Sequence, residues 1–542
     1  MSSRREIRIC KHLSPDALDL AGFALAVLLF GALALRQLHL PGLYQDEAYD
    51  AAAAVRLLQG GSWDYTLLPG RLNLPLMVMD HVGPTSTYLL LPFLEAFGIG
   101  AMAVRVYEFA VALAALALAF CWMRRVLPAG TAWAAALLLA ASPSFWLACR
   151  NGIHVSFVMV PIALGALICC DRWWRNQARV AWLYAGAFHL GLGLSSKILF
   201  LWFIIALAGG VALARRQAFS RLRRRQVAVG ALWFAIGAAP LLIFNLLSRG
   251  LTLRTMLEGL RTTPYGVHNA AFLTNLHTQL HSFASLLGGS WLTWTGAAPY
   301  DPAAVWLFTA SAVLLLLCWR ATSRRLLFCL LAVLVILVES CFTISTLGPK
   351  HLVIMLPLPQ VITVGAIAAA WRRRAHRLFR AAFVALIALA ALGFGWDLHS
   401  DCRYHRALAA TGGVGQFSYA HNQLAGFLVA HRIWRPLAGD WGFASNLEVL
   451  SAGRVRVRQI FELTEPPPYA FTRMEARRTL GQAGSVYLFH AEGIAAAPGR
   501  RQAVHQVAAE MGLRLVPLAT FADGLGRPVI LVERPEPARE KR

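Results

Sequence analysis

The stretch "LYQDEAYD" carries two adjacent carboxylates, Asp46 and Glu47, directly after the first long apolar run of the chain. A carboxylate can serve as a general base when it lies within about 2.6–3.2 Å of the hydroxyl whose proton it takes. Carboxylates also stabilise the positive end of a helix, and residues 46–61, which end in two glycines, have the pattern of such a helix. The pair therefore offers either proton transfer or helix capping.

A set of basic residues stands at the ends of apolar segments, on the same predicted side as the two carboxylates: Arg105, Arg150, Lys197, Lys350 and His351. An ionisable residue within a membrane domain costs roughly 2.5–3.5 kcal/mol on insertion scales, so its presence needs a reason. Taken singly, each of these residues could be a snorkelling anchor or half of an internal ion pair. Several cations that face one carboxylate pair favour a pocket for an anion, and phosphate is the natural anion for Lys and Arg.

The composition assigns the chain to the membrane proteins. Of its 542 residues, 58% are hydrophobic and only 14% are charged, and the mean hydropathy is +0.55, which excludes an ordinary soluble enzyme. Apolar runs close to the roughly 20 residues that cross a bilayer recur over residues 17–398. The formal net charge of +24 could suggest nucleic-acid binding, but the basic residues cluster between every second pair of apolar segments. That distribution marks membrane topology, so we expect no nucleic-acid partner.

The positive-inside rule predicts a cytoplasmic N-terminus and eleven membrane spans. The spans lie near residues 17–35, 104–123, 131–148, 153–170, 181–196, 198–213, 228–247, 303–319, 326–346, 352–370 and 381–398. An odd number of spans leaves the tail outside. We therefore expect a multi-pass protein of the cell inner (cytoplasmic) membrane whose C-terminal domain is periplasmic or extracellular.

Two apolar segments admit a second interpretation. Residues 86–97 are apolar but short, and counting them as a span would move every later basic cluster to the wrong side, so we predict an interfacial helix. The first span follows basic residues and contains a sequence that resembles a signal-peptide cleavage site. Its length, and the carboxylates that follow so closely, favour an uncleaved anchor.

The predicted fold class is a polytopic α-helical membrane protein of about eleven transmembrane helices with a small C-terminal α/β domain. Residues 1–400 form the membrane domain, with exported loops at 36–104 and 248–302, and residues 401–542 form the exported domain. In this tail, strand-like and helix-like pieces alternate and end in a hairpin. It has no phosphate-cradling glycine motif and no convincing Ser-His-Asp set, so we expect it to pack on the exported face and shape access for an acceptor.

A metal site is considered in the second exported loop, where His277 and His281 are four residues apart on one helical face. That spacing could bind a metal, but the sequence offers no third ligand nearby. We therefore interpret the two histidines as part of a polar helix face and expect neither a catalytic metal nor a cofactor.

The order of several segments resembles the multispan GT-C glycosyltransferases. The segments are "LYQDEAYDAAAAVRLLQGG", "AVRVYEFAVALAALALAFCW", "CRNGIHVSFVMVPIALGALICC", "GLGLSSKILFLWF" and "GPKHLVIMLPLPQVI". Within this group the chain is similar to glycosyltransferase family 39, which includes protein O-mannosyltransferases and the bacterial aminoarabinose transferase that acts on lipid A. The resemblance covers the membrane domain, and the acid pair is its most specific element.

The resemblance implies transfer of a sugar from a polyprenyl-phosphate carrier in the bilayer to a glycan, lipid or protein acceptor on the exported side. Asp46 matches the family's catalytic acid, which would take the proton of the attacking acceptor hydroxyl. Glu47 is the second carboxylate of the catalytic pair and would hold the loop or the acceptor. The resemblance assigns the carrier phosphate to these cations: Arg105, Arg150, Lys197, Lys350 and His351.

One segment departs from the family pattern. Many bacterial relatives have a Lys-Pro-Pro-like turn before the surface helix, whereas this chain has "DHVGPTS". Asp80 and His81 therefore stand where a phosphate-binding Lys is expected, and His81 could replace it only in part. With His154, these two residues are candidates for contacts to the donor or the acceptor.

Two other classes of function stay open at this point. A transporter or flippase of an anionic lipid or solute would also place ionisable residues in a membrane domain. An assembly factor that binds partners through its exported tail would need no catalytic Asp46. The sequence shows no inverted repeat, and its carboxylates lie in an external loop instead of at the midplane, which favours the enzyme.

Overall fold

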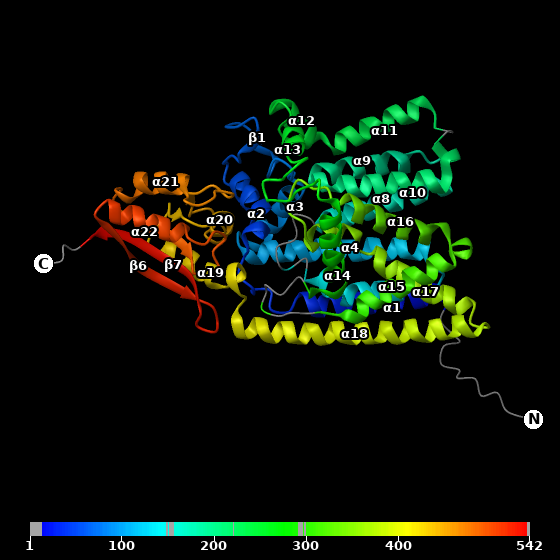
Figure 1. The fold of residues 1–542 in the computed structure, drawn as a ribbon. Helices are drawn as coiled ribbons and strands as arrows, with labels where there is room; N and C mark the ends of the chain where they lie inside the picture. The colour runs from blue at the N-terminus through cyan, green and yellow to red at the C-terminus, as the bar shows by residue number, and fades with distance from the viewer. Residues whose placement is uncertain are drawn as a thin grey trace, which may run out of the picture.

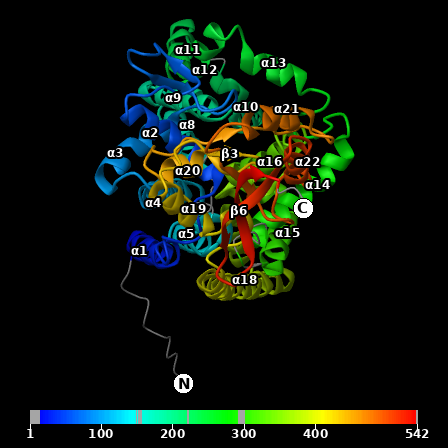
Figure 2. The same ribbon diagram turned by 90° about the vertical axis from the view of Figure 1, so that its left-hand side faces the viewer.

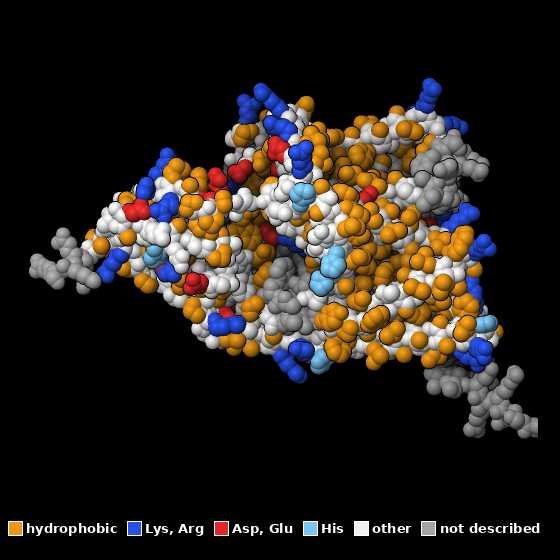
Figure 3. Space-filling model, in the orientation of Figure 1, with side chains coloured by type: hydrophobic (Ala, Val, Ile, Leu, Met, Phe, Trp, Pro, Cys, Tyr) orange, Lys and Arg blue, Asp and Glu red, His pale blue; other side chains and the backbone are white. Residues whose placement is uncertain are grey.

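The computed structural model describes residues 14–147, 150, 157–219, 222–290, 296 and 300–538. Figure 1 shows a bundle of long helices that run in roughly one direction and a C-terminal domain, with its sheet, that lies against one end of the bundle. Helix α1 (Pro15–Ala34) begins at the far end and runs toward the C-terminal domain. Apolar side chains cover the flank of the bundle, and several basic side chains lie at its far end (Figure 3).

The bundle helices follow the predicted apolar segments. After α1 they are α4 (Ala101–Val126), α5 (Ala132–Ala141), α6 (Pro143–Trp146), α8 (Met159–Arg175), α9 (Ala181–Ser196), η1 (Ile198–Phe200), α10 (Leu201–Phe219), α11 (Arg224–Gly237), α12 (Ala239–Leu247), α15 (Pro302–Leu317), η3 (Trp319–Ala321), α16 (Arg324–Glu339), η4 (Pro349–Met355), α17 (Leu358–Arg372) and α18 (Arg377–Thr411). Side-chain caps fix several N-termini: Ser14, Asp301 and Ser323 accept backbone N–H groups of the first turns of α1, α15 and α16. One apolar core joins most of these helices, whereas Leu241 and Phe244 of α12 pack in a separate cluster with Leu76 and Met77.

Each of the eleven predicted segments contains a helix, so the positions of the apolar elements are confirmed. Within the described ranges, three helices are long and apolar enough to cross a membrane alone: α1, α4 and α18. Two bent pairs, α11 with α12 at 72° and η4 with α17 at 50°, raise this to five if each pair is one span. Both bends lie at or beside proline, which lacks the N–H that would continue a helix. The number of spans and their sidedness stay predictions.

The two exported loops carry short helices. The first contains α2 (Gln45–Leu58), the hairpin of β1 (Tyr65–Leu67) and β2 (Leu74–Met77), and α3 (Thr85–Phe97); the second contains α13 (Leu251–Glu258) and α14 (Phe272–Gly288). The helix predicted after the acid pair is therefore confirmed as α2. At 13 residues α3 is roughly 20 Å long, too short for a hydrocarbon core of roughly 30 Å. His277 and His281 lie exposed on α14, and no three potential metal ligands converge among the residues that the structure describes.

The C-terminal domain is an α/β unit. It consists of η5 (Gly415–Phe417), α19 (Ala420–Ala430), β3 (Leu437–Ala438), α20 (Ala444–Leu450), β4 (Arg458–Gln459), α21 (Ala470–Leu480), β5 (Tyr487–His490), α22 (Arg500–Glu510), β6 (Leu513–Ala522) and β7 (Pro528–Pro537). The strand order is β4-β3-β5-β7-β6, with β3 parallel to β4 and β5 and with β7 antiparallel to β5 and β6. Seen from this end, the domain lies across the centre of the bundle (Figure 2).

The boundary between the two domains differs from the one expected at residues 400 and 401. Helix α18 continues through this point without a break and ends at Thr411. It stops because Gly412 adopts the left-handed conformation, with φ of 68°, that terminates many helices. The last turns of α18 belong to the bundle, where His405 is buried and stacks on Trp146.

Candidate active site

Two buried arginines fix the segment between α1 and α2. Arg105 Nη1 donates to the carbonyl of Leu38 at 2.7 Å, and Arg150 Nη2 donates to the carbonyls of Gln37 at 2.8 Å and Leu40 at 3.2 Å. Each arginine is about 1% exposed. A buried charge is tolerated only with partners, and here the backbone of the loop supplies them. The arginines therefore hold the entry to α2 in one place.

Glu47 ties the first turn of α2 to the bundle. Its Oε1 accepts a hydrogen bond from Arg105 Nε at 3.1 Å, and its Oε2 accepts the backbone N–H of Tyr44 at 3.2 Å. The Glu47 and Arg105 side chains are fully buried. We therefore assign Glu47, Arg105 and Arg150 to the scaffold that positions α2, and these contacts do not support the predicted contact of the two arginines with a carrier phosphate.

The C-terminal domain closes over the start of α2. The Tyr44 ring stacks on Phe417 with centroids 4.1 Å apart and meets the edge of Trp441 at 5.6 Å. Gly42 donates its N–H to the carbonyl of Phe417 at 2.8 Å. A Cβ at Gly42 would lie 2.0 Å from the carbonyl oxygen of Ser418, so only glycine permits this approach of the two backbones.

Polar contacts extend this interface along one face of α2. The Gln45 side chain accepts the backbone N–H of Ser445 at 3.0 Å and donates to its hydroxyl at 3.3 Å. Further along, Arg56 makes a bidentate pair with Glu448, with N–O distances of 2.6 and 2.7 Å. Such paired, charge-assisted hydrogen bonds define both distance and orientation. The C-terminal domain thus contacts α2 near both of its ends.

Asp46 projects from α2 toward two lysines. Lys350 Nζ lies 3.5 Å from Asp46 Oδ2, and the side chains are 33% and 25% exposed. Lys197, at the break between α9 and η1, is buried behind this pair, with Nζ 3.4 Å from Nδ1 of His351. Electrostatic interactions link Lys197 to both Asp46 and Lys350. The structure therefore gathers one accessible carboxylate and two lysines at one place.

The environment of Lys197 changes its proton affinity. Burial penalises the ammonium form and Lys350 repels it, which together lower the pKa of Lys197 to about 7. Asp46 and Asp50 oppose this shift without cancelling it. An anion that entered beside Lys197 would restore the charged form, so the site is suited to take up a negative group together with a proton.

Asp50 is a further residue of this site and was not among the residues predicted from the sequence. It lies one turn after Asp46 on α2, is buried, and accepts a hydrogen bond from Thr87 Oγ1 at 3.2 Å. Its spacing of four residues from Asp46 places both on the same helix face, and that spacing was the available signal. Asp50 adds negative charge beside Lys197.

Tyr265, in the loop after α13, was also missed. It interacts electrostatically with Asp46, Asp80 and Tyr49, and burial raises its pKa. It belongs to the second exported loop, whereas Asp46 belongs to the first. No sequence pattern pairs the two loops, so this electrostatic interaction is visible only in the folded chain.

Asp80 and His81 form a pair beside Lys197. His81 Nδ1 lies 2.6 Å from Asp80 Oδ1, and Thr255 Oγ1 donates to Asp80 Oδ2 at 2.8 Å. Burial works to raise the pKa of Asp80, but the hydrogen bonds from His81 and Thr255 outweigh it and lower the pKa. The carbonyl of His81 accepts the N–H of Ile198 at 3.1 Å, which fixes this turn next to Lys197.

The predicted site residues fall into three groups. Asp46, Lys197, Lys350 and His351 come together, with Asp80 and His81 beside them. Glu47, Arg105 and Arg150 lie beneath as supports. His154 lies outside the described residues. Figure 3 shows a hollow between the C-terminal domain and the bundle in which acidic and basic side chains are visible.

Comparisons with known proteins bear on the whole chain. The structure of ArnT from Cupriavidus metallidurans bound to undecaprenyl phosphate superposes with a TM-score of 0.59, at 14% identity, over 95% of this chain and 97% of that one. Its apo state gives 0.61 at the same identity and coverage. The chain has the GT-C fold. The predicted resemblance to GT-C glycosyltransferases is thereby confirmed.

Two further comparisons agree with the GT-C fold. The sequence model of the dolichyl-phosphate-mannose-protein mannosyltransferase family matches residues 81–244, which run from the Asp80–His81 turn to α12. Mycobacterial arabinofuranosyltransferase AftD gives a TM-score of 0.51 at 15% identity, over 96% of this chain and 42% of that one. No sequence among the curated proteins matches.

Proposed function

We propose that this GT-C protein transfers a sugar from a polyprenyl-phosphate-linked donor to a glycan, lipid or protein acceptor on the exported face of the inner membrane. The observation that carries the proposal is the pairing of one accessible carboxylate, Asp46, with Lys350 at 3.5 Å and with the buried Lys197 behind it. A proton acceptor next to a site for an anionic leaving group is what this reaction requires.

The proposed reaction is a displacement at the anomeric carbon of the donor sugar. The acceptor hydroxyl attacks this carbon and Asp46 takes its proton, while the bond from the carbon to the carrier phosphate oxygen breaks and the electron pair leaves with the phosphate. Lys350 and Lys197 stabilise the charge that grows on this oxygen. Before the attack, when the donor binds, Lys350 exchanges its contact with Asp46 for one with the carrier phosphate, which frees the carboxylate to act as a base.

The comparisons support the class of donor. One similar structure holds undecaprenyl phosphate, and the matched family model is described by a dolichyl-phosphate sugar, so both point to a polyprenyl phosphate. The pair of lysines in this chain agrees with a phosphate anion, which Lys binds as a point charge. His351, Asp80 and His81 are proposed to contact the donor or the acceptor at the edge of the same site.

The proposed side of the membrane follows from the basic residues. They favour a cytoplasmic N-terminus, and α1 begins at the end of the bundle opposite the C-terminal domain. Asp46 lies at the end that carries the C-terminal domain, which the proposal places in the periplasm or outside the cell. A base at this end meets a lipid-borne donor and a water-borne acceptor at the membrane surface.

Asp46→Asn tests the proposal, with Asp64→Asn as the matched control. Asp64 is an exposed carboxylate in the same loop, and it acts electrostatically on Arg56 and Tyr65. Asn keeps the size of Asp46 but cannot accept a proton at neutral pH, so we expect transfer to fall by roughly 10²- to 10⁴-fold. Mass spectrometry of envelope glycans is compared between cells that lack the gene and cells that carry the wild type or either variant.

The alternative functions predict other outcomes. If Asp46 serves only as a negative charge in the first turn of α2, Asn removes roughly 0.3–1 kcal/mol of helix stability and transfer is unchanged. An assembly factor would also be insensitive to this change, and a transporter would alter the distribution of a lipid or solute without the loss of one glycan linkage. Wild-type glycans in cells with a stably expressed Asp46→Asn protein would remove Asp46 as the base.

A further inference from the structure

A cavity lies in the bundle between α4, α8, α10 and α16, at the end opposite the candidate active site. Its volume is about 360 Å³, within the roughly 300–1,000 Å³ that is typical of ligand pockets. Helix α4 carries Arg105 in its first turns and Val126 at its last residue, which separates the cavity from Arg105 by roughly 30 Å along the helix. The cavity is therefore independent of the proposed transfer reaction.

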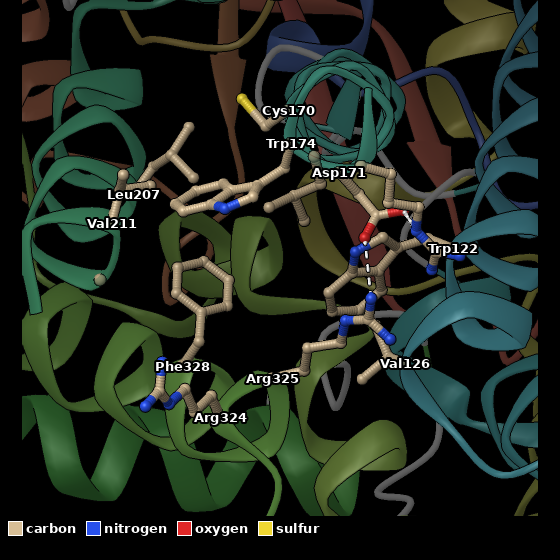
Figure 4. A pocket seen from close by; sticks show the side chains of 13 residues that line it. Trp122, Val126, Cys170, Asp171, Trp174, Leu207, Val211, Arg324, Arg325 and Phe328 are labelled. Atoms are coloured by element: carbon tan, nitrogen blue, oxygen red, sulfur yellow. Dashed lines mark hydrogen bonds and ion pairs between the residues drawn. The ribbon is translucent and has the colours of Figure 1, made fainter. Parts of the chain in front are cut away.

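The interior of this cavity is apolar and includes the aromatic rings of Trp122, Trp174 and Phe328. Figure 4 shows Trp174 and Phe328 turned toward each other, with Leu207 and Val211 on one wall. The ring of Phe328 lies against the backbone at Gly210, where a Cβ would meet the ring at 2.2 Å. The missing side chain at Gly210 lets this ring pack against α10 instead of filling the cavity. The lining resembles the environment of a hydrocarbon chain.

The rim of the cavity is basic. Three arginines and one aspartate line it: Arg175, Arg324, Arg325 and Asp171, a net formal charge of +2. Asp171 is shared, because it accepts from Arg125 at 3.0 Å, from Arg175 at 2.9 Å and from Arg325 at 3.4 Å. One carboxylate cannot neutralise three guanidinium groups, and the side chains of Arg175 and Arg325 are each 48% exposed. The rim keeps an excess of positive charge at the mouth of an apolar space.

We propose that this cavity binds an anionic phospholipid of the surrounding bilayer. One acyl chain enters between Trp174 and Phe328, and the phosphate of the headgroup lies on Arg175, Arg324 and Arg325. Charge complementarity selects an anionic headgroup, and the guanidinium forks match phosphate oxygens. The apolar interior selects a lipid over a free anion, because a soluble phosphate would gain nothing from the aromatic walls. A bound lipid contacts the last turns of α4 and α8, the middle of α10 and the first turns of α16.

Native mass spectrometry of the full-length protein, with lipid added in detergent, tests this proposal. Phosphatidylglycerol is compared with phosphatidylcholine of the same acyl chains, and we expect preferential retention of phosphatidylglycerol. Arg324→Gln should reduce that retention by about fivefold, the equivalent of the roughly 1 kcal/mol that one basic residue contributes near an anionic lipid. The control Arg372→Gln makes the same charge change on an exposed residue in the last turn of α17, outside the cavity, and should behave as the wild type.

A second variant tests the contribution of the lipid's acyl chain apart from that of its headgroup. Leu207→Trp fills the apolar interior and leaves the arginines in place, so it should lower phosphatidylglycerol retention by a similar factor. Equal retention of the two lipids by the wild type, or unchanged retention in Arg324→Gln or Leu207→Trp, would overturn the proposal. The same holds if inorganic phosphate alone raises the thermal midpoint as much as phosphatidylglycerol does, because the site would then bind a soluble anion.

Discussion

Lys197 should couple the binding of a polyprenyl phosphate to proton uptake. Burial and the repulsion from Lys350 lower the pKa of Lys197 from 10.5 to about 7. At pH 7 about half of the free protein therefore carries a neutral amine at this position. A phosphate beside the amine favours the charged form, so the pKa of Lys197 rises when the anion binds.

The direction and size of the pH effect follow from this shift. The bound state keeps a proton that the free state loses above pH 7, so affinity falls as the pH rises from 7 toward the pKa of the bound state. Each pH unit in this window weakens binding by up to tenfold, or about 1.4 kcal/mol. If the anion restores the ordinary pKa of 10.5, the dissociation constant rises by roughly 50-fold between pH 7 and 9. A phosphate monoester has its second pKa near 6 and stays largely dianionic over this range.

Equilibrium binding of undecaprenyl phosphate to the protein in nanodiscs, measured from pH 6.5 to 9, tests this reasoning. Lys197→Arg keeps its charge throughout, because Arg is not deprotonated in proteins, and its pH profile should be flat. Lys197→Met should weaken binding at pH 6.5 by roughly 10- to 150-fold, the worth of a hydrogen bond to a charged group, and should also lose the slope.

Lys350→Met is the control for a general loss of positive charge. It should weaken binding, but the dissociation constant should still depend on pH. This dependence should begin at a higher pH, because Lys350 no longer repels the charge of Lys197 and the pKa of Lys197 is therefore higher. A flat profile in the wild type, or a wild-type slope that survives in Lys197→Met, would refute the assignment of proton uptake to Lys197.

Three further changes probe the scaffold around Asp46. Glu47→Gln leaves Arg105 as a buried cation without its carboxylate and should lower the free energy of unfolding by roughly 3–5 kcal/mol; an unchanged thermal midpoint would contradict this. Glu448→Gln weakens the bidentate contact with Arg56 and should speed hydrogen exchange in α2 by an amount equivalent to roughly 1.5–3 kcal/mol; unaltered exchange would show that the contact is dispensable. Acid should loosen the C-terminal domain, because burial, with a smaller effect of a neighbouring histidine, lowers the pKa of His421 to about 3. Between pH 6.5 and 3 only the unfolded state binds this proton, so the free energy of unfolding falls by up to about 1.4 kcal/mol per pH unit as the pH decreases. Calorimetry at pH 5 and 7 should show a smaller loss of stability between these two pH values for His421→Gln than for the wild type.

The helices and the accessible part of the site could be predicted because local sequence determines them. Apolar runs of membrane length locate the helices of the bundle, and the basic clusters assign Lys197 and Lys350 to the side of Asp46, where the structure brings them together. Asp50 was equally predictable, because a spacing of four residues places it on the face of Asp46. The prediction considered the adjacent pair of carboxylates and not the helical spacing.

The roles of the buried arginines depend on contacts between distant segments, which sequence patterns do not specify. Charge alone does not determine whether a guanidinium meets a phosphate or a backbone carbonyl, and the carbonyls that Arg105 and Arg150 bind belong to a loop with no regular structure to extrapolate. The interface between α2 and the C-terminal domain also depends on contacts between distant segments. Gln45 and Ser445 bond across a sequence separation of 400 residues.

The geometry of α2 explains how one short helix can carry the proposed base and also be held rigidly. Successive residues of an α-helix differ by about 100° around its axis, so Gln45 and Glu47 point in nearly opposite directions, whereas Gln45 and Arg56 share a face. The shared face meets the C-terminal domain, and the face of Glu47 meets a buried arginine of α4. Asp46 lies between these two faces, with Asp50 about 40° away, and this third face is the one directed at the lysines. Because both flanking faces are anchored, the carboxylate of Asp46 cannot shift relative to the lysines unless one of the two anchors breaks. The C-terminal domain therefore belongs to the scaffold of the site, although Asp46, Lys197 and Lys350 themselves all belong to the bundle and its loops.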